Sequence, residues 1–434
     1  MEFLLSELAV KLGGQLHGPD ITVNGVTTDS RTIGPGELFV PLVAERDGHD
    51  FIDAALDAGC AGYLSVRHLD RGSSIRVANT EDALSQLGHI ARERLGAHVV
   101  GVTGSVGKTS VKDMIYAACS PGVTTHVNKG SFNNEIGLPL TLANAPGDAD
   151  VVVTEMGARG VGHIRHLCKI AEPTIGVVTA VALAHSELFG TIETVAKAKA
   201  ELVESLPSNG IAILNADDPN VAEMAAKTQA DVITFGLDGD IRPTQITFDR
   251  LNRPSFVLET PNGSVGVNLP VSGGHMAINA TAAIAVATAV GVPLDQAARG
   301  LEQLAISPWR MEIDVTASGM VIINDSYNAN PTSMRAALRT LADIEASEKV
   351  AMVGAMGELG VERVAEHRNI AAEATAAGIR VIAIDAADYG PDVVHVSTLD
   401  EAVSLADEFE PTTAVLIKGS RSAGLERLAD KLKT

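Results

Sequence analysis

The sequence has few aromatic residues and too little positive charge for several classes of partner. Aromatic residues make up 3% of its 434 residues, and it contains a single tryptophan. Lysine and arginine total 33 against 54 aspartate and glutamate residues, so the formal net charge is −21. Nucleic acids and anionic membranes require an exposed basic surface, and single-stranded nucleic acids also stack on aromatic rings. We therefore expect neither partner, although a few local cations can still bind a small anionic ligand.

Cysteine is also scarce, and long hydrophobic runs are missing. Cys60, Cys119 and Cys168 stand singly, without the paired spacing of a zinc site or a redox motif. We expect them to be buried thiols in a reducing compartment. The sequence contains no run of 18 apolar residues, the length that a membrane-spanning helix needs. Its first residues also lack the apolar core of a secretion signal. These absences predict a cytoplasmic protein.

The order of apolar runs predicts an α/β protein of three domains. Residues 1–80 contain short strands and helices and form a small first domain. Apolar strands that alternate with helices predict a parallel sheet in residues 81–306 and a further α/β domain in residues 307–434. The expected strands of the two larger domains are His98–Thr103, Val151–Val153, Ile175–Val178, Ile211–Leu214, Val321–Ile323, Val350–Val353, Val381–Ile384 and Val415–Ile417.

Two shorter patterns give more local predictions. Thr80-Glu81-Asp82 is typical of a helix N-cap followed by acidic residues in the first turn. Pro261-Asn262-Gly263 separates two strand-like runs and predicts an antiparallel hairpin.

The strongest local signal is a glycine-rich loop between a strand and a helix. Gly104-Ser105-Val106-Gly107-Lys108-Thr109 follows the apolar run His98–Thr103 and opens a helical run that extends to Cys119. Such glycines allow backbone amides to face a phosphate at a helix N-terminus. Lys108 would neutralise the phosphates, and the Thr109 hydroxyl would bind Mg²⁺. The alternative is a glycine turn with an incidental lysine, since Val102 stands where the general motif has its first glycine.

Single polar residues near predicted strand ends are candidate metal ligands. Glu155 and His185 each follow an apolar strand. Carboxylate oxygens suit Mg²⁺, and open parallel sheets bind ligands at the carboxyl ends of their strands. Taken alone, a glutamate is usually a solvated residue, and a histidine is more often structural than a ligand. Lys199 lies in the run from Ala196 to Glu201, whose composition by itself favours an exposed, salt-bridged helix face.

The last domain contains three polar segments that could contact a nucleotide. Asp325 and Asn328 follow a strand, Arg310 ends the segment Pro308-Trp309-Arg310, and Lys418-Gly419-Ser420-Arg421 follows the last strand. Such residues could contact the ribose, adenine and phosphates, but each segment is also common as a simple turn or helix cap.

Together these segments resemble the Mur ligase family, and the resemblance extends over all three predicted domains. The motifs occur in the family's order, which makes the set highly specific. They are Gly104-x-x-Gly107-Lys108-Thr109, Asn133-Asn134-Glu135-Ile136-Gly137, Glu155-Met156-Gly157, Ala184-His185, Ala198-Lys199, Asn215-Ala216-Asp217-Asp218-Pro219, Gly274-His275 with Asn279, Tyr327-Asn328-Ala329-Asn330-Pro331 and Lys418-Gly419-Ser420-Arg421.

Some motifs are typical of the branch that adds D-alanyl-D-alanine to a UDP-linked muramoyl tripeptide. They include the Tyr327 and Lys418 segments above, and they imply these two small-molecule substrates. The others are Gly354-x-Met356-x-Glu358-Leu359-Gly360, Thr28-Asp29-Ser30-Arg31 and Asp47-Gly48-His49-x-Phe51.

The resemblance implies a small α/β precursor-binding domain, a central ATPase domain with a phosphate-binding loop and a C-terminal Rossmann-like domain. It further implies ATP and Mg²⁺ as cofactors and a Lys199 that is carboxylated by CO₂. We also expect the protein to be a monomer. The ATP-binding residues would be Gly104, Ser105, Val106, Gly107, Lys108, Thr109, Ser110, His275, Asn279, Arg310, Asp325 and Asn328. Lys108, His185, Lys199 and Arg310 would be catalytic, and Thr109, Glu155, His185 and Lys199 would bind metal. Ser30, Arg31, Asp47, His49, Asn133, Asn134 and Glu135 would bind the UDP-linked precursor.

Four positions depart from the family's pattern and leave alternatives open. Ala180 stands where the family usually has Asn, Met276 replaces an Asn, Trp309 a Gly and Asn324 an Asp. One alternative is a paralogous amide ligase with another amine acceptor or a secondary-metabolite substrate. The other is a nucleotide-binding regulatory protein without ligase turnover.

Overall fold

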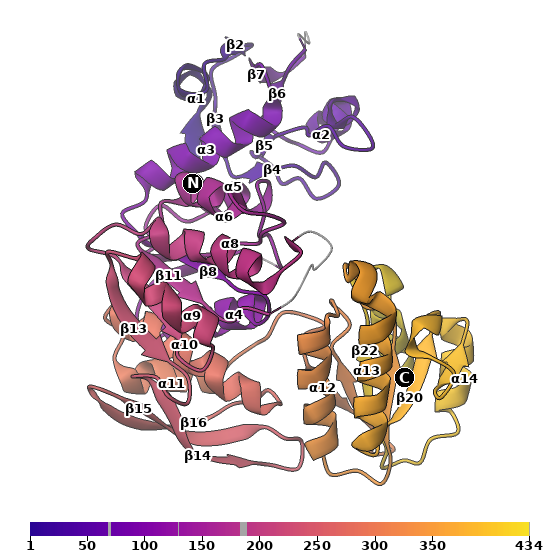
Figure 1. Cartoon of the computed structure of the whole chain (residues 1–434). Coiled ribbons are helices and arrows are strands. Elements are labelled where there is room, and N and C mark those ends of the chain that lie inside the picture. The colour runs from indigo at the N-terminus through magenta and orange to yellow at the C-terminus, as the bar shows by residue number, and fades with distance from the viewer. Residues whose placement is uncertain (68–70, 129, 183–188, 434) are drawn as a thin grey trace. The chain divides into compact units, whose positions relative to one another are not determined.

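The computed structural model describes residues 1–67, 71–128, 130–182 and 189–433 (Figure 1). The packing of Cα atoms divides the chain into two compact units. The first unit comprises Met1–Gly101, Val123–Gly157 and Ile164–Ile175, and the second comprises Val102–Gly122, Ala158–His163 and Gly176–Thr434. The division into three domains after residues 80 and 306 stays a prediction.

The first unit begins with two small sheets and three short helices. In the five-stranded sheet, of order β2-β7-β6-β5-β4, only the β2–β7 pair is antiparallel. Beside it, β1 and β3 form an antiparallel pair. The elements are β1 (Glu2–Leu4), α1 (Leu5–Lys11), β2 (Gln15–His17), β3 (Thr22–Asn24), β4 (Val26–Thr27), β5 (Leu38–Phe39), η1 (Gly48–Phe51), α2 (Ile52–Asp57), β6 (Gly62–Ser65) and β7 (Ser73–Arg76).

Helix α3 (Thr80–Arg94) is capped one residue earlier than the sequence pattern predicted. The side-chain oxygen of Asn79 accepts hydrogen bonds from the backbone amides of Glu81 and Asp82, at 2.8 and 3.1 Å. Asn79 has extended backbone angles, as an N-cap requires, whereas Thr80 is already the first helical residue. The predicted cap at Thr80 is therefore wrong, because an asparagine in the preceding position satisfies the same amides.

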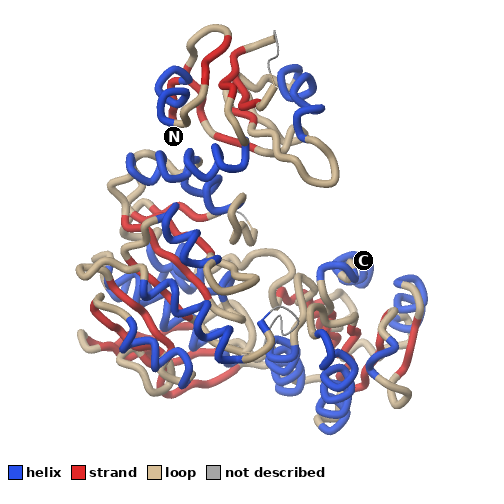
Figure 2. The backbone as a smooth tube through the Cα atoms, turned by 45° about the horizontal axis from the view of Figure 1, so that its top comes forward, coloured by secondary structure: helices blue, strands red, loops and turns tan. Residues whose placement is uncertain are grey.

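A six-stranded sheet contains all four parallel strands predicted for the middle of the chain. Its order is β13-β12-β11-β8-β10-β9, and the pairs β10–β9 and β12–β13 are parallel. Helices occur between the strands, as expected for parallel neighbours that need crossover connections (Figure 2). The elements are β8 (His98–Thr103), α4 (Lys108–Cys119), β9 (Thr125–Val127), α5 (Gly137–Ala143), β10 (Val151–Glu155), α6 (His163–Ala171), β11 (Ile175–Val178), α8 (Ile192–Glu204), β12 (Ile211–Asn215), α9 (Pro219–Ala222), η2 (Glu223–Lys227) and β13 (Asp231–Phe235).

The second unit also contains the predicted hairpin, extended by one strand. Strands β14 (Arg242–Phe248), β15 (Pro254–Thr260) and β16 (Gly263–Asn268) form an antiparallel sheet, in which Thr260 pairs with Gly263 across the turn. Helices α10 (Gly274–Ala289) and α11 (Leu294–Glu302) follow, and both pack against α4. They approach α4 closely, since a Cβ on Gly300 would lie 2.0 Å from the Ala117 carbonyl oxygen.

The C-terminal part of the second unit is a sheet of order β17-β18-β22-β19-β20-β21. Only β17, at one edge, is antiparallel to its neighbour. Figure 1 shows α12 and α13 crossing in front of this sheet. The elements are β17 (Glu312–Val315), β18 (Val321–Asn324), α12 (Pro331–Asp343), β19 (Lys349–Val353), η3 (Gly360–Glu362), α13 (Arg363–Ala376), β20 (Arg380–Ile384), η4 (Ala387–Tyr389), β21 (Val394–Val396), α14 (Leu399–Ala406), β22 (Ala414–Lys418), η5 (Arg421–Ala423) and α15 (Glu426–Leu432).

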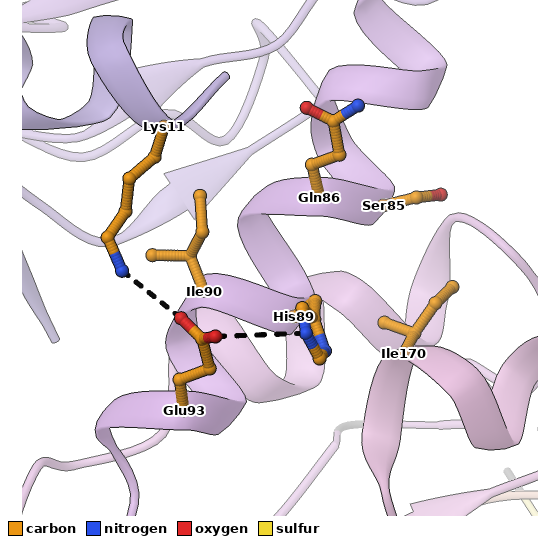
Figure 3. Close-up of a pocket in the computed structure, with 7 residues that line it drawn as sticks. All are labelled: Lys11, Ser85, Gln86, His89, Ile90, Glu93 and Ile170. Atoms are coloured by element: carbon orange, nitrogen blue, oxygen red, sulfur yellow. Dashed lines mark hydrogen bonds and ion pairs between the residues drawn. The ribbon is translucent and has the colours of Figure 1, made fainter. Parts of the chain in front are cut away.

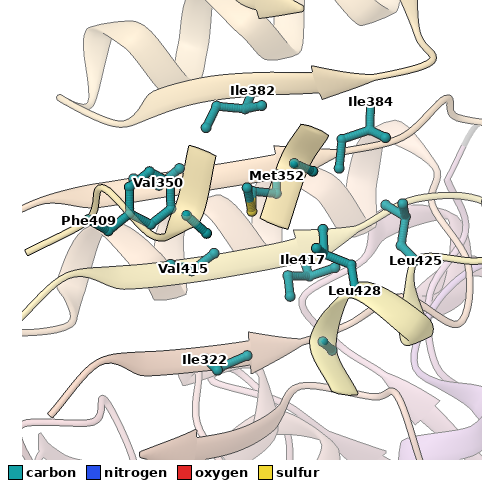
Figure 4. Packing of buried hydrophobic residues seen from close by; sticks show 13 residues of the cluster. Ile322, Val350, Met352, Ile382, Ile384, Phe409, Val415, Ile417, Leu425 and Leu428 are labelled. Carbon is teal, nitrogen blue, oxygen red and sulfur yellow. The ribbon is translucent and has the colours of Figure 1, made fainter. Parts of the chain in front are cut away.

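Alternate residues of these parallel strands face opposite helix layers. One set of strand side chains, which includes Val350, Met352, Val415 and Ile417, packs with Leu428 of α15 in a cluster that α14 completes (Figure 4). The intervening residues must point to the other face, because side chains alternate along a strand. Both faces of the sheet are therefore apolar, which explains why its strands read as continuous hydrophobic runs.

Two further predictions about the chain can be compared with the structure. All three cysteines are buried free thiols, as expected, and burial raises the pKa of Cys60 to about 11 and that of Cys119 to about 12. Among the described residues, no helix is both long and apolar enough to cross a lipid bilayer.

His367 is a buried titratable side chain that ties α13 to the loop after β19. Its Nε2 accepts a hydrogen bond from the Met356 amide at 2.8 Å, and its Nδ1 lies 2.7 Å from the Arg363 carbonyl oxygen. The first atom must be unprotonated and the second protonated, so the ring is neutral. Burial lowers the pKa of His367, although the bond to the Arg363 carbonyl opposes the shift.

We predict that His367→Asn flattens the pH dependence of stability. Because the folded pKa is lowered, the contribution of His367 is complete above the unfolded value of about 6.5 and decreases as pH falls towards the folded pKa. Urea unfolding should show that the free energy of unfolding falls less in the variant than in the wild type between about pH 7.5 and 5. The difference should be about 1.4 kcal/mol for each unit by which the pKa of His367 differs between the folded and unfolded states. His166→Asn, at an exposed position, should keep the wild-type slope. Equal slopes for all three proteins would contradict this account.

Candidate active site

The glycine-rich loop adopts a backbone that only glycine tolerates at two positions. Gly104 has φ +151°, and a Cβ there would lie 1.9 Å from Thr179 Oγ1. Gly107 has φ +84° and precedes the first residue of α4. Both glycines are therefore required by the backbone, and the loop leads its amides directly into a helix N-terminus, where an anion binds favourably.

Three hydrogen bonds fix this loop to the segment after β11. The amide of Ser105 donates to the Ala180 carbonyl at 2.8 Å, and its hydroxyl donates to the Ala182 carbonyl at 2.9 Å. The Thr179 hydroxyl donates to the Val106 carbonyl at 2.6 Å. Ala180, one of the departures from the family pattern, contributes through its backbone, so this support does not depend on its side chain.

Lys108 and Thr109 begin α4 and point their polar groups to the loop and to Arg310. The Lys108 ammonium donates to the Gly104 carbonyl at 2.8 Å, which folds its side chain back over the loop. The buried Thr109 hydroxyl accepts a hydrogen bond from Arg310 Nη2 at 3.0 Å. The guanidinium of Arg310 also lies over the Tyr327 ring, 3.9 Å from its centroid. The structure thus brings three of the predicted ATP-binding residues together.

Asp325 and Asn328 are held by Lys418 at the carboxyl ends of neighbouring strands. The Lys418 ammonium lies 2.5 Å from Asp325 Oδ2 and 2.8 Å from the Asn328 carbonyl oxygen. Asp325 Oδ1 accepts from the amide of Met311 at 3.1 Å. Burial lowers the pKa of Lys418, and the attraction of Asp325 opposes that shift. Lys418 was part of a recognised motif, but no pattern in the sequence indicated that it fixes the Asp325 loop.

His275 and Asn279 project from the first turns of α10. Asn279 lies beside the glycine-rich loop, since a Cβ on Gly107 would be 3.3 Å from its Oδ1. His275 is half-buried, and this burial lowers the pKa of its imidazole, which Lys418 and Arg339 also lower and Asp325 raises. Both side chains therefore belong to the same surroundings as the loop and Asp325.

Lys199 lies on the buried side of α8, contrary to the exposed face that composition alone favoured. The exposed fraction of Lys199 is 4% and that of Glu201 is 1%. Glu201 accepts a hydrogen bond from the Gly162 amide at 2.5 Å. Ala198, Lys199, Ala200 and Glu201 are all buried, whereas Lys197 is exposed, so the charges of this run do not share one face of α8. His185, together with Ala184, lies outside the described residues.

In the first unit, buried Glu155 and half-buried Asn133 form a polar contact. Asn133 Nδ2 donates to Glu155 Oε1 at 2.9 Å, and the Gly157 amide donates to the Asn133 carbonyl at 2.7 Å. Asn134 accepts from the Gly137 amide at 2.9 Å at the start of α5, while Glu135 is exposed. Glu155 is the last residue of β10, so its carboxylate lies at the carboxyl end of a parallel strand.

Of the four precursor-binding residues predicted in the first 50 positions, two contact each other and a third pairs with a neighbour in its own motif. Arg31 pairs with Asp29 at 2.7 Å, and this guanidinium lowers the pKa of Asp29 to about 2. His49 Nδ1 lies 2.7 Å from Asp47 Oδ1, and its Nε2 accepts from the Val66 amide. Ser30 is half-buried in the turn before Arg31. These contacts stabilise two turns. The role of the residues in precursor binding stays a prediction.

Sequence reasoning did not identify one surface pocket of the first unit (Figure 3). It has a volume of about 490 Å³, and none of the predicted site residues lines it. Among its lining residues, Glu93 lies 3.1 Å from Lys11 and 3.9 Å from His89. The lining residues are Lys11, Ser85, Gln86, His89, Ile90, Glu93 and Ile170.

Comparison with known proteins places this geometry in a family. Residues 102–287 match the Mur ligase middle domain, and residues 309–421 match the Mur ligase glutamate ligase domain. The chain belongs to the Mur ligase family. A UDP-N-acetylmuramoyl-tripeptide–D-alanyl-D-alanine ligase of Escherichia coli is 37% identical over 99% of this chain and 98% of its own length. The ligase of that name from Mycobacterium tuberculosis is 36% identical over 94% and 91%.

Solved structures of Mur ligases share the fold over nearly the whole chain. MurF from Acinetobacter baumannii has a TM-score of 0.90 and 31% identity, covering 100% of this chain and 99% of its own. MurF from Thermotoga maritima, solved in complex with ADP, has a TM-score of 0.84 and 27% identity, covering 95% and 97%. The three-domain α/β fold class expected from the sequence is confirmed by these neighbours.

We predict that Gly104→Ala weakens ADP binding by at least about tenfold, which corresponds to about 1.4 kcal/mol. The added methyl group would meet Thr179 Oγ1 at 1.9 Å and force the loop to shift. Gly266→Ala is the matched control, because a Cβ there meets nothing within 4 Å. Calorimetric titration with ADP would measure both variants. Wild-type affinity in Gly104→Ala would exclude this loop as the nucleotide site.

Proposed function

We propose that this Mur ligase uses ATP to join D-alanyl-D-alanine to a UDP-N-acetylmuramoyl tripeptide during peptidoglycan precursor synthesis. The observation that carries the proposal is the meeting of Arg310 with Thr109 at the start of α4, at 3.0 Å. It brings an arginine from the C-terminal family match to the phosphate-binding loop of the middle one. Full-length relatives named for this reaction support the choice of substrates.

The reaction consists of two transfers. A carboxylate oxygen of the tripeptide attacks the γ-phosphorus of ATP, and the bond to the ADP oxygen breaks, which gives an acyl phosphate and ADP. The amine of D-alanyl-D-alanine then attacks the acyl carbon. The tetrahedral intermediate collapses with loss of inorganic phosphate and a proton, which leaves the amide. Catalysis of such transfers depends mainly on positioning and on stabilisation of charge.

The described residues can supply that positioning and charge. Lys108 would reach from its present bond with the Gly104 carbonyl to the phosphates, and the loop amides would cradle them. Arg310 carries a planar cation whose orientation is fixed by the Tyr327 ring, so it can stabilise charge on the transferring phosphoryl group. We propose that Asp325 and Asn328 contact the ribose and adenine, with His275 and Asn279 as nearby ATP-binding residues.

The oxygen donors of the chain fit Mg²⁺. Glu155 is a buried carboxylate oriented by Asn133, and Thr109 presents a buried hydroxyl. Both donor types are ones that Mg²⁺ prefers. We propose these two residues as ligands, with His185 and a carboxylated Lys199 as further ones. Bound Mg²⁺ would neutralise phosphate charge.

Lys199 fits the proposed carboxylation because its side chain is buried. An ammonium repels a cation, whereas a carbamate presents two anionic oxygens on the same stem. The 4% exposed fraction of Lys199 would also shield a carbamate from water. We further propose that the precursor binds to Ser30, Arg31, Asp47, His49 and the Asn133–Glu135 segment, and that the enzyme is a cytoplasmic monomer.

Phosphate release with both substrates tests the function. We expect ATP-dependent release with the UDP-tripeptide and D-alanyl-D-alanine together, and a mass gain that matches the pentapeptide product. Either substrate alone should give only background release. Turnover with a different amine but not with this dipeptide would mean a paralogous ligase. Absence of turnover with every amine would refute the ligase assignment.

Carboxylation of Lys199 is testable by ¹³C NMR of enzyme equilibrated with labelled bicarbonate. We expect a carbamate signal that is lost in Lys199→Arg, together with a fall in turnover of at least about 100-fold. Lys197→Arg is the matched control, since this lysine is exposed on the same helix. A carbamate signal that survives Lys199→Arg, or full activity of that variant, would contradict the assignment.

A further inference from the structure

Arg310 is flanked by two residues with left-handed backbone conformations. Trp309 has φ +62° and Met311 has φ +53°. Large side chains rarely adopt this region, which glycine enters freely. A tryptophan at position 309 is therefore unfavourable for the backbone alone, and its contacts must compensate for that.

Backbone hydrogen bonds hold this kinked segment on both sides of Arg310. The Tyr327 amide donates to the Trp309 carbonyl at 3.2 Å, and the Trp309 amide donates to Glu312 at 3.3 Å. The Met311 amide donates to Asp325 at 3.1 Å. The orientation of Arg310 is thus set by the backbone at its two neighbours.

The Trp309 ring itself is held by Arg421, the first residue of η5, which follows the last strand. The guanidinium of Arg421 lies over the indole, 4.4 Å from its centroid. Glu426 holds the same guanidinium from the side, at 3.2 Å. A cation over an indole face is the most favourable of the cation–π pairs. This contact gives tryptophan an advantage at position 309 that glycine would lack.

Tyr327 connects the two arginine–aromatic pairs. Its ring supports the Arg310 guanidinium, while its amide holds the carbonyl of Trp309. A change in the position of Trp309 is therefore transmitted through one peptide unit to Arg310, and from there to the Thr109 hydroxyl at 3.0 Å.

We propose that Trp309, stacked on Arg421, is a positioning residue that aims Arg310 at the phosphate-binding loop. The inference deepens the proposed function and rests on it. Trp309 does not touch the reacting atoms. It fixes the backbone from which Arg310 extends, so its loss affects the transition state more than the binding of ATP.

Steady-state kinetics of Trp309→Gly test the proposal, because glycine retains the left-handed backbone and removes only the ring. We expect kcat to fall between about 10-fold and 100-fold, with little change in the KM for ATP. In an Arg310→Lys background, Trp309→Gly should cause no further loss, since the group that it positions is already changed. Unchanged kcat, or losses that multiply in the double variant, would overturn the proposal.

Arg421→Gln provides a second variant that keeps the indole. It should lower kcat in the same direction and shift the fluorescence of Trp309, the single tryptophan of the chain. Arg380→Gln is the matched control, because it removes an arginine at the start of β20 that lies over the Phe409 ring, 5.8 Å from its centroid. Its kcat should equal that of the wild type. An unchanged spectrum and kcat in Arg421→Gln would refute the stacked pair.

Failure of the proposed function would be recognised separately, as absence of turnover in the wild-type chain with every amine. In that case the coupling of Trp309 to Arg310 can be tested by the fluorescence of Trp309 during a titration with ADP. A nucleotide-induced change in emission that is lost in Arg310→Lys would support the coupling of Trp309 to Arg310. The same change in both proteins would overturn it.

Discussion

The hydrogen bond between Arg310 and Thr109 is the contact on which the functional account depends. Thr109 is the second residue of the helix that the glycine-rich loop opens, and Arg310 lies at the start of the C-terminal family match. A phosphoryl group at the loop would therefore meet a cation that the loop itself does not supply. Such pre-oriented charge is usually the largest contribution to catalysis of this kind.

The surrounding structure serves to hold these two residues. Gly104 and Gly107 allow the loop to curl, and bonds to the segment after β11 keep it rigid. Lys418 fixes the Asp325 loop, and Asp325 in turn binds the amide next to Arg310. Buried charge is costly unless it is paired, so this network is stable only because each partner is present. The departures at Ala180 and Trp309 fit within it, the first through its backbone and the second through Arg421.

Much of the architecture could be predicted from the sequence, because strands buried on both faces produce unmistakable apolar runs. The strand His98–Thr103 and the helix Lys108–Cys119 match the structure residue for residue. The exact start of a helix was harder to predict where two neighbouring residues could both cap it, as Asn79 and Thr80 show for α3. The burial of Lys199 could not be read from composition, since charges separated by alanines favour an exposed helix face. The Trp309–Arg421 pair joins residues more than a hundred positions apart, and no local pattern signals it.

The most direct test of the account follows the oxygen atoms of the tripeptide carboxylate. If ATP phosphorylates that carboxylate, one of its oxygens must leave with the phosphate when the amine attacks. With a carboxylate labelled with ¹⁸O, mass spectrometry should find one labelled oxygen in the released phosphate. Unlabelled phosphate accompanied by product would contradict activation through an acyl phosphate, and with it the proposed roles of the glycine-rich loop and Arg310.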